Sequence, residues 1–287
     1  MGKTATTWEL MKSSWRVLMR DKALLLFPVI SGVACLLVLL TFILPAVGIF
    51  HGGMAAVARS TSVLGYVLLF CYYVCNFFVI FFFNAALVAY VVERIKGGEP
   101  TLGGSLREAA ACAPQIAAWA IVASTIGLVF KILESRLGLL ARIVIAIVGV
   151  AWALVTYFVV PLIVIERKGA IEAIGASKDL LTRTWGKQLV SGLGYGLIGF
   201  LLTIPAIAII VIAIVGAIAS GVQHLGLLFY GGFSLLAQAA VVYLIGLGIV
   251  LSALRAIFST VLFLYARDGT VPEGFDAASL QGAMKPA

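Results

Sequence analysis

The chain has 287 residues, of which 63% are hydrophobic and only 11% are charged, with a formal net charge of +8. Its mean hydropathy of +1.15 is far above that of an ordinary soluble domain. A soluble fold needs polar residues over its outside, whereas a chain surrounded by lipid can turn large apolar side chains outward. The composition therefore excludes an ordinary soluble domain. The basic residues are spread in short segments beside apolar runs, which also argues against nucleic acid as a partner.

Six long apolar runs follow one another along the chain: residues 23–50, 63–92, 115–133, 142–165, 189–220 and roughly 231–266. Each contains the roughly 20 residues that a helix needs to cross a bilayer. The runs are continuously apolar and lack the alternation of barrel strands, which predicts helices. The predicted fold is an all-α membrane protein with about six transmembrane helices. Four prolines within these runs are expected to kink or end helices: Pro28, Pro45, Pro161 and Pro205.

The positive charges predict the orientation in the membrane. Fifteen of the twenty Lys and Arg residues fall in the N-terminal segment, in residues 93–114 and 166–187, and after the last run. Four fall in the opposite connections. Since cytoplasmic segments are enriched in Lys and Arg, both termini are expected to be cytoplasmic.

An internal repeat is suggested by three units, approximately residues 1–98, 99–169 and 170–269, within a single membrane domain of residues 1–287. Each unit has an amphipathic interfacial helix, a helical hairpin and a basic exit. Arg94, Arg167 and Arg267 occupy the exits, and glycine follows each within a few residues. Arginine can reach lipid headgroups while glycine lets the chain leave helical geometry. The alternative is convergence on ordinary helix-end chemistry.

The predicted amphipathic segments contain tryptophans suited to the membrane interface. Trp8 and Trp15 share one helical face of the first segment beside a basic face, and Trp185 lies in the third. Together with the exit arginines, these residues are predicted interfacial anchors. The alternative is that the amphipathic helices pack against the protein itself.

Arg255 is a charge well inside a predicted span, twelve residues before Arg267. One hypothesis is a contact with an anion or a lipid headgroup, because intramembrane charges commonly face a cavity, a partner or a substrate. The other is that residues 233–254 complete the crossing and leave Arg255 at the membrane boundary.

Small and polar residues within the spans predict close helix packing: Gly192, Gly196, Gly199, Asn76 and Asn84. Substrate contact by the asparagines and a flexible transport helix at the glycines are the alternatives. The two histidines cannot close a zinc site alone, and the sequence shows no recognisable catalytic motif. We therefore expect no enzyme activity, no cofactor and no metal.

Two resemblances bear on identity. Residues 14–18, 21–28 and 31–32 resemble the opening of an uncharacterised prokaryotic family of multi-spanning membrane proteins of unknown function. More loosely, the three-unit plan and residues 265–267 are similar to the membrane regions of bacterial membrane-anchored glycerophosphodiester phosphodiesterases. This second resemblance implies a bacterial cytoplasmic membrane and a six-helix bundle. It carries no catalytic residue over to this chain.

Two functions remain. The first is a non-catalytic protein that organises membrane lipids, or membrane-protein partners, in an oligomeric state that the sequence does not specify. The second is a transporter or channel for a lipid-like or apolar solute. All twelve acidic residues lie outside the spans or at their ends, which disfavours proton coupling in the second. Residues 270–287 are expected to form a flexible cytoplasmic tail.

Overall fold

The computed structural model describes residues 3–50, 63–136, 138–185, 193–222, 226–271 and 275. Within these ranges the chain folds into helices joined by short turns, and no strand occurs there. This confirms the predicted all-α fold. The elements are α1 (Lys3–Arg20), the 3₁₀ helix η1 (Lys22–Leu25), α2 (Leu26–Phe50), α4 (Val63–Ile95), α5 (Leu102–Ala111), α6 (Ala113–Arg136), α7 (Leu139–Val155), α8 (Val159–Glu166), α9 (Ala170–Trp185), α10 (Leu193–Val222) and α11 (Gly226–Asp268).

Five helical segments in the described part of the chain are long and apolar enough to cross a membrane: Lys22–Leu44, Val63–Ile95, Ala113–Glu134, Arg142–Glu166 and Gly232–Asp268. They correspond to five of the six predicted spans. The remaining predicted span coincides with α10, in which Leu201–Gly216 is a shorter apolar stretch. Residues 189–192 of that prediction lie outside the described residues.

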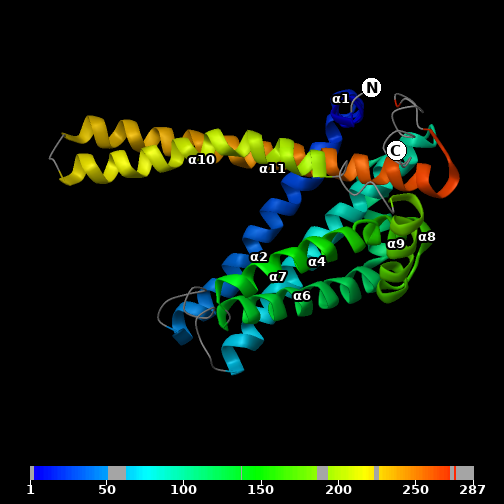
Figure 1. The fold of residues 1–287 in the computed structure, drawn as a ribbon, viewed down its shortest axis with the longest axis horizontal. Helices are drawn as coiled ribbons and strands as arrows, with labels where there is room; N and C mark the ends of the chain where they lie inside the picture. The colour runs from blue at the N-terminus through cyan, green and yellow to red at the C-terminus, as the bar shows by residue number, and fades with distance from the viewer. Residues whose placement is uncertain are drawn as a thin grey trace.

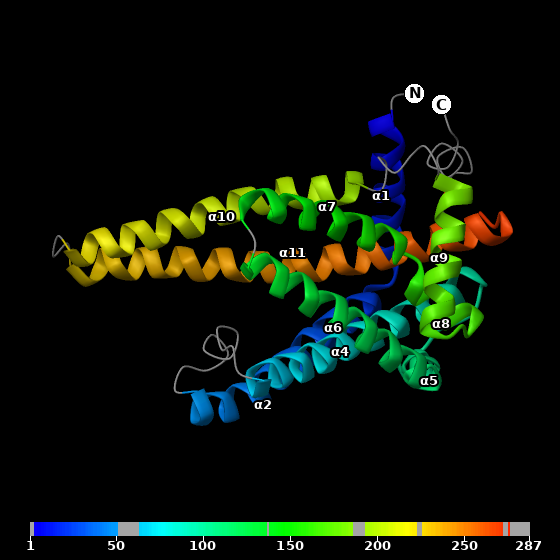
Figure 2. The same cartoon turned by 60° about the horizontal axis from the view of Figure 1, so that its bottom comes forward.

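Three helical hairpins extend from a shared base, as Figures 1 and 2 show. They pair α2 with α4, α6 with α7, and α10 with α11. The base holds the main buried core, which we call the hub. Its principal parts are residues 85–92 of α4, residues 158–164 at the start of α8, and residues 253–264 of α11. The hub therefore joins segments that are far apart in the sequence.

The order of the elements follows the predicted plan, because α1, α5 and α9 each precede one hairpin. This order does not by itself establish a repeat in sequence or structure. The threefold repeat and its unit boundaries therefore stay a prediction.

Large apolar side chains cover the outside of the hairpins. On α2, Leu36 and Leu37 are each 60% exposed, and on α7 and α11 the exposed residues include Ile147 and Val242. A water-soluble protein would not leave such long apolar faces uncovered. These faces therefore fit a hydrocarbon surrounding.

The fourth predicted span is broken into α7 and α8 by a turn at residues 156–158. Pro161 explains the position of the break. Proline lacks the N–H that would bond the carbonyl four residues earlier, at Tyr157, and its ring collides with that carbonyl. The helix restarts at Val159, which places Pro161 in the first turn of α8, where proline is tolerated.

The exits from α4 and α11 use glycine in the left-handed region, as predicted. Gly97 has φ +81° and Gly269 has φ +68°. At the first exit the N–H groups of Gly98 and Gly97 donate to the carbonyls of Glu93 and Arg94 at 3.0 and 3.1 Å. This is the Schellman pattern that ends many helices.

The exit from α8 differs from the prediction. The positive φ, 56°, falls on Arg167 itself and not on Gly169. Contacts of the Arg167 side chain with α5 and its C-terminal cap, described below, accompany this conformation. The expected glycine role is therefore wrong at this one exit.

Gly216 lets α10 approach α11 closely. A Cβ atom at this position would lie 2.5 Å from the Phe233 ring, whereas one at Gly232 would meet no atom within 4 Å. We expect Gly216→Ala to destabilise the protein by about 1–3 kcal/mol through overpacking. Detergent-solubilised protein titrated with a denaturing detergent would measure this, with Gly232→Ala as the control. A Phe233→Leu second change should recover part of the loss, and equal effects of the two glycine variants would contradict the prediction.

Candidate functional site

The amphipathic helix α1 packs one side on the protein and leaves apolar residues exposed on another. Leu18 is fully buried in the hub, while Trp15 and Met19 are 44% and 41% exposed. Arg16 and Arg20 beside them are exposed. The structure thus places the predicted anchor Trp15 at an accessible apolar edge next to cations.

The other two amphipathic helices also pack on the protein. Ala109 of α5 and Leu181 of α9 are buried in the hub. On one face, therefore, both helices pack against the protein itself, which is the alternative to membrane contact. Trp8 of α1 and Trp185 of α9 lie on described helices, but their side chains are outside what the structure describes.

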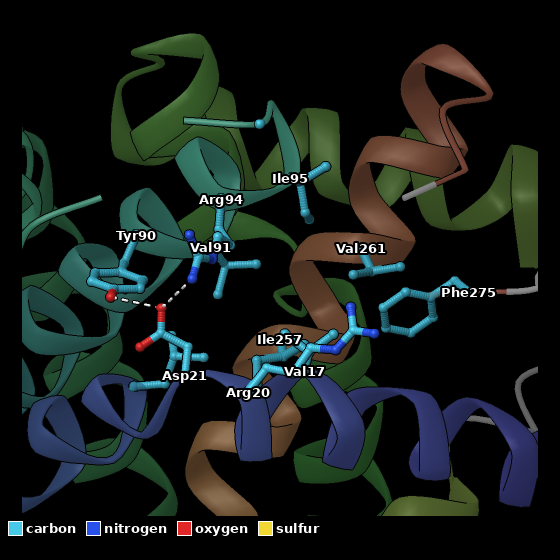
Figure 3. Close-up of a pocket in the computed structure, with 12 residues that line it drawn as sticks. Val17, Arg20, Asp21, Tyr90, Val91, Arg94, Ile95, Ile257, Val261 and Phe275 are labelled. Atoms are coloured by element: carbon cyan, nitrogen blue, oxygen red, sulfur yellow. Dashed lines mark hydrogen bonds and ion pairs between the residues drawn. The ribbon is translucent and has the colours of Figure 1, made fainter. Parts of the chain in front are cut away.

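Asp21 joins α1, η1 and α4 at the junction shown in Figure 3. One carboxylate oxygen accepts a hydrogen bond from the Ala23 N–H at 3.3 Å, which caps η1. The other accepts from the Tyr90 hydroxyl at 2.8 Å and lies 3.4 Å from the Arg94 guanidinium. Arg94 is therefore an ion-pair partner as well as a predicted anchor. The Asp21 side chain is only 13% exposed, so this cluster is partly shielded from water.

A small pocket of about 140 Å³ lies beside this cluster, between α1, α4 and α11. Arg20 and Phe275 complete its wall, and Figure 3 shows the two side chains lying close to each other. The pocket wall contains two arginines and one aspartate, which leaves it with a net positive charge. A wall of this kind suits a small anionic group better than a cation.

Arg167 connects the end of α8 to α5 and its C-terminal cap. Its guanidinium forms an ion pair with Glu108 and donates to the Cys112 sulfur at 2.6 Å. Burial raises the pKa of the Cys112 thiol, and the positive charge of Arg167 opposes that rise. The Arg167 side chain is 45% exposed, so it can still meet solvent or headgroups.

The left-handed conformation of Arg167 makes a testable prediction. An alanine there keeps the backbone strain and loses the side-chain contacts, whereas a glycine loses the contacts but removes the strain. We expect Arg167→Gly to be about 1 kcal/mol more stable than Arg167→Ala. Detergent-denaturation curves of the two variants would measure the difference, and an alanine variant as stable as the glycine variant would refute the prediction.

The third exit arginine, Arg267, is held near the end of α11. It donates to the adjacent Asp268, with one nitrogen to oxygen distance of 2.8 Å, and its guanidinium lies 5.5 Å from the centre of the Phe263 ring. The three exit arginines are therefore not brought together into one site. Each has its own acidic partner: Asp21, Glu108 or Asp268.

Arg255 is exposed on α11, at the edge of the hub. Its guanidinium lies 6.0 Å from the centre of the Tyr157 ring, at the break between α7 and α8. Its neighbours Leu254 and Ala256 are buried. The helix continues to Asp268, so the residues that follow Arg255 form protein core and do not lead directly out of the fold.

The residues predicted to pack between helices are only partly described. Asn76 and Asn84 lie on α4, and the buried Nδ2 atom of Asn76 has no hydrogen-bond partner within the described residues. Gly196 and Gly199 belong to α10, but their surroundings, like Gly192 itself, lie outside what the structure describes. Their packing roles stay predictions.

An apolar groove of about 490 Å³ lies between α1, α10 and α11. This groove could not be predicted from the sequence, because it depends on α1 crossing a hairpin that lies far away in the chain. The Tyr243 hydroxyl donates to the Leu202 carbonyl at 3.3 Å and links the two hairpin helices beside it. The groove is lined by Met11, Lys12, Trp15, Leu202, Tyr243, Gly246, Leu247, Val250, Leu251 and Leu254.

The helical fold, the apolar hairpins and the spans of membrane-crossing length define a multi-pass α-helical membrane protein. A family model matches residues 63–274, from the start of α4 to beyond the end of α11. The chain belongs to this family, DUF6159, a family of unknown function. No curated protein and no solved structure matches the chain.

The family finding confirms the main resemblance seen in the sequence. The residues that suggested it, within 14–32, precede the matched region, so the two observations rest on different parts of the chain. The looser resemblance to the membrane regions of phosphodiesterases receives no support from the comparisons.

Proposed function

We propose that this protein is a non-catalytic membrane protein that organises anionic phospholipid at the face of the membrane where α1 lies. The observation that carries the proposal is the placement of α1. This helix is fixed to the hub through Leu18, yet exposes Trp15 and Met19 beside Arg16 and Arg20. Apolar side chains next to cations are the combination that binds an anionic membrane surface.

The proposed membrane boundary runs through α1, Asp21, Arg94 and Arg255. Several observations support this level. Val17 of α1 and Ile257 of α11 line the same pocket beside Asp21, and Trp15 of α1 and Leu254 of α11 line the neighbouring groove, so α1 crosses α11 close to Arg255. The part of α11 before Arg255 carries exposed apolar residues, whereas the part after it is buried in the hub.

A membrane boundary at this height favours the hypothesis that Arg255 lies at the end of the membrane span and not inside it. Residues 233–254 would then cross the bilayer, since about 20 helical residues are sufficient. With the positive charges counted above, the same boundary is proposed to face the cytoplasm of a bacterial cell, with both termini on that side.

Reconstitution with spin-labelled lipids would test the proposal. In bilayers of phosphatidylcholine, the protein is expected to select labelled phosphatidylglycerol over labelled phosphatidylcholine, measured as the motionally restricted fraction of each probe. Arg16→Gln and Arg255→Leu should each lower this preference by up to about fivefold, since one cation near the surface contributes about 1 kcal/mol. Lys131→Gln, at the predicted opposite side, is the control. Equal restriction of the two lipids would overturn the proposal.

The second candidate, a transporter or channel for a lipid-like solute, is favoured by the apolar groove between α1, α10 and α11. It predicts a flux that the first proposal does not require. Vesicles containing fluorescent phospholipid would show whether the reconstituted protein moves lipid between leaflets. Transfer reproducibly above that in empty vesicles would support the transporter, and transfer at the empty-vesicle rate would exclude lipid movement between leaflets.

A further inference from the structure

We propose that the groove between α1, α10 and α11 holds one acyl chain of an anionic phospholipid, with Lys12 binding the lipid phosphate. This inference rests on the proposed function and adds a defined binding site to it. The groove is almost wholly apolar, and its volume of about 490 Å³ falls within the usual range for small-molecule sites.

The length of the groove matches one leaflet of a bilayer. On α11 it runs from Tyr243 to Leu254, and eleven helical residues rise about 16 Å. Half of the roughly 30 Å hydrocarbon layer is about 15 Å. Leu254 is next to Arg255, the residue placed at the proposed boundary. The groove therefore extends from that boundary towards the middle of the membrane.

The rim of the groove supplies the chemistry that a headgroup needs. Lys12 is exposed there and can pair with a phosphate as a point charge. Trp15, 44% exposed, is an amphipathic ring suited to the boundary between headgroups and hydrocarbon. A cation beside an apolar groove suits an anionic phospholipid better than a neutral apolar solute.

The occupant is a lipid because the groove opens on a lipid-facing surface. Next to its lining residues, Val242 and Ile245 of α11 are 69% and 59% exposed. On the α10 side, the lining residue Leu202 is 42% exposed and its neighbour Leu201 is 56% exposed. In a bilayer these neighbours contact acyl chains, and the groove is continuous with that surface.

Two glycines of α11 offer a matched pair of variants. Gly246 lines the groove and Gly248 does not, and a Cβ atom at either position would meet nothing within 4 Å. Leucine at Gly246 should therefore fill the groove without displacing backbone, while leucine at Gly248 adds the same side chain elsewhere on the same helix. Val250→Trp fills the groove from the next turn and serves as a second blocking variant if Gly246→Leu folds poorly.

The test uses phosphatidylglycerol with a photoreactive diazirine in its acyl chain, in nanodiscs of phosphatidylcholine and phosphatidylglycerol. After irradiation, mass spectrometry would locate adducts on the peptide that contains residues 243–254. We expect Gly246→Leu and Val250→Trp to lower adducts there about tenfold, an effect of the size that occluding a pocket gives. Gly248→Leu should leave them unchanged. Unlabelled phosphatidylglycerol should compete with the photoreactive lipid better than unlabelled phosphatidylcholine does. Lys12→Gln should reduce this difference by about fivefold.

The possible failures are distinguishable. Labelling that is equal in Gly246→Leu and Gly248→Leu, or equal competition by the two unlabelled lipids in the unmodified protein, would overturn the assignment of the groove. If the spin-label preference for phosphatidylglycerol persists in that case, the proposed function stands without this site. Loss of that preference in the unmodified protein would overturn both.

Discussion

Replacing Asp21 by alanine is expected to lower the free energy of unfolding by about 2–4 kcal/mol, because it removes a partly buried carboxylate with three partners. The change leaves the Ala23 N–H of η1 uncapped and removes the acceptor of the Tyr90 hydroxyl. It also leaves Arg94 without its ion-pair partner next to Arg20. The loss should therefore exceed that of any one of these contacts.

Denaturing-detergent titrations of the purified protein would measure the effect. Tyr90→Phe is the matched control, because it removes only one hydrogen bond and should cost about 1–2 kcal/mol. If Asp21→Ala destabilises the protein no more than Tyr90→Phe, then the cap and the ion pair contribute nothing measurable.

Phe263→Ala should have a still larger effect, about 3–5 kcal/mol, because it opens a cavity in the hub. Phe263 is fully buried, and its ring centre lies 6.1 Å from that of Phe158, which lies in the turn between α7 and α8. The ring also lies beneath the Arg267 guanidinium. One truncation therefore weakens the contact between the second and third hairpins and removes the aromatic contact of the Arg267 guanidinium.

The same titration can separate a hub defect from a general loss of apolar area. Leu236→Ala is the control on the same helix, where the side chain is 50% exposed on the hairpin and should cost less than about 1 kcal/mol. Phe263→Leu should fall between the two variants. A similar loss in Phe263→Ala and Leu236→Ala would contradict the description of residues 253–264 as the principal packing segment of α11.

The spans and many helix ends could be predicted from the sequence, because both depend on local chemistry. Apolar runs of sufficient length identify the crossing helices, and glycine after arginine identifies the ends of α4 and α11. The break at residues 156–158 could also be anticipated from Pro161, which was expected to kink or end a helix. At α8 the same reasoning failed, since Arg167 takes the left-handed position while contacting α5 and Cys112, contacts that local sequence does not specify.

The hub and the groove could not be predicted, because both depend on contacts between distant segments. Asp21 meets Tyr90 across 69 residues, and Lys12 shares the groove with residues of α11 only after α1 has crossed that helix. The amphipathic pattern identified an apolar face of α1. It could not show which residues of that face are buried in the protein, as Leu18 is, and which are exposed, as Trp15 is. That division decides which residues can meet lipid.

The composition of the hub has a consequence for biosynthesis. Membrane helices insert one after another as the ribosome makes them, and their packing follows insertion. Residues 253–264 are the last large part of the hub to be synthesised. Until then, the surfaces of the first two hairpins that pack against these residues have no partner. A nascent chain halted before this section should therefore be inserted but loosely packed, and open to proteases at α5 and α9.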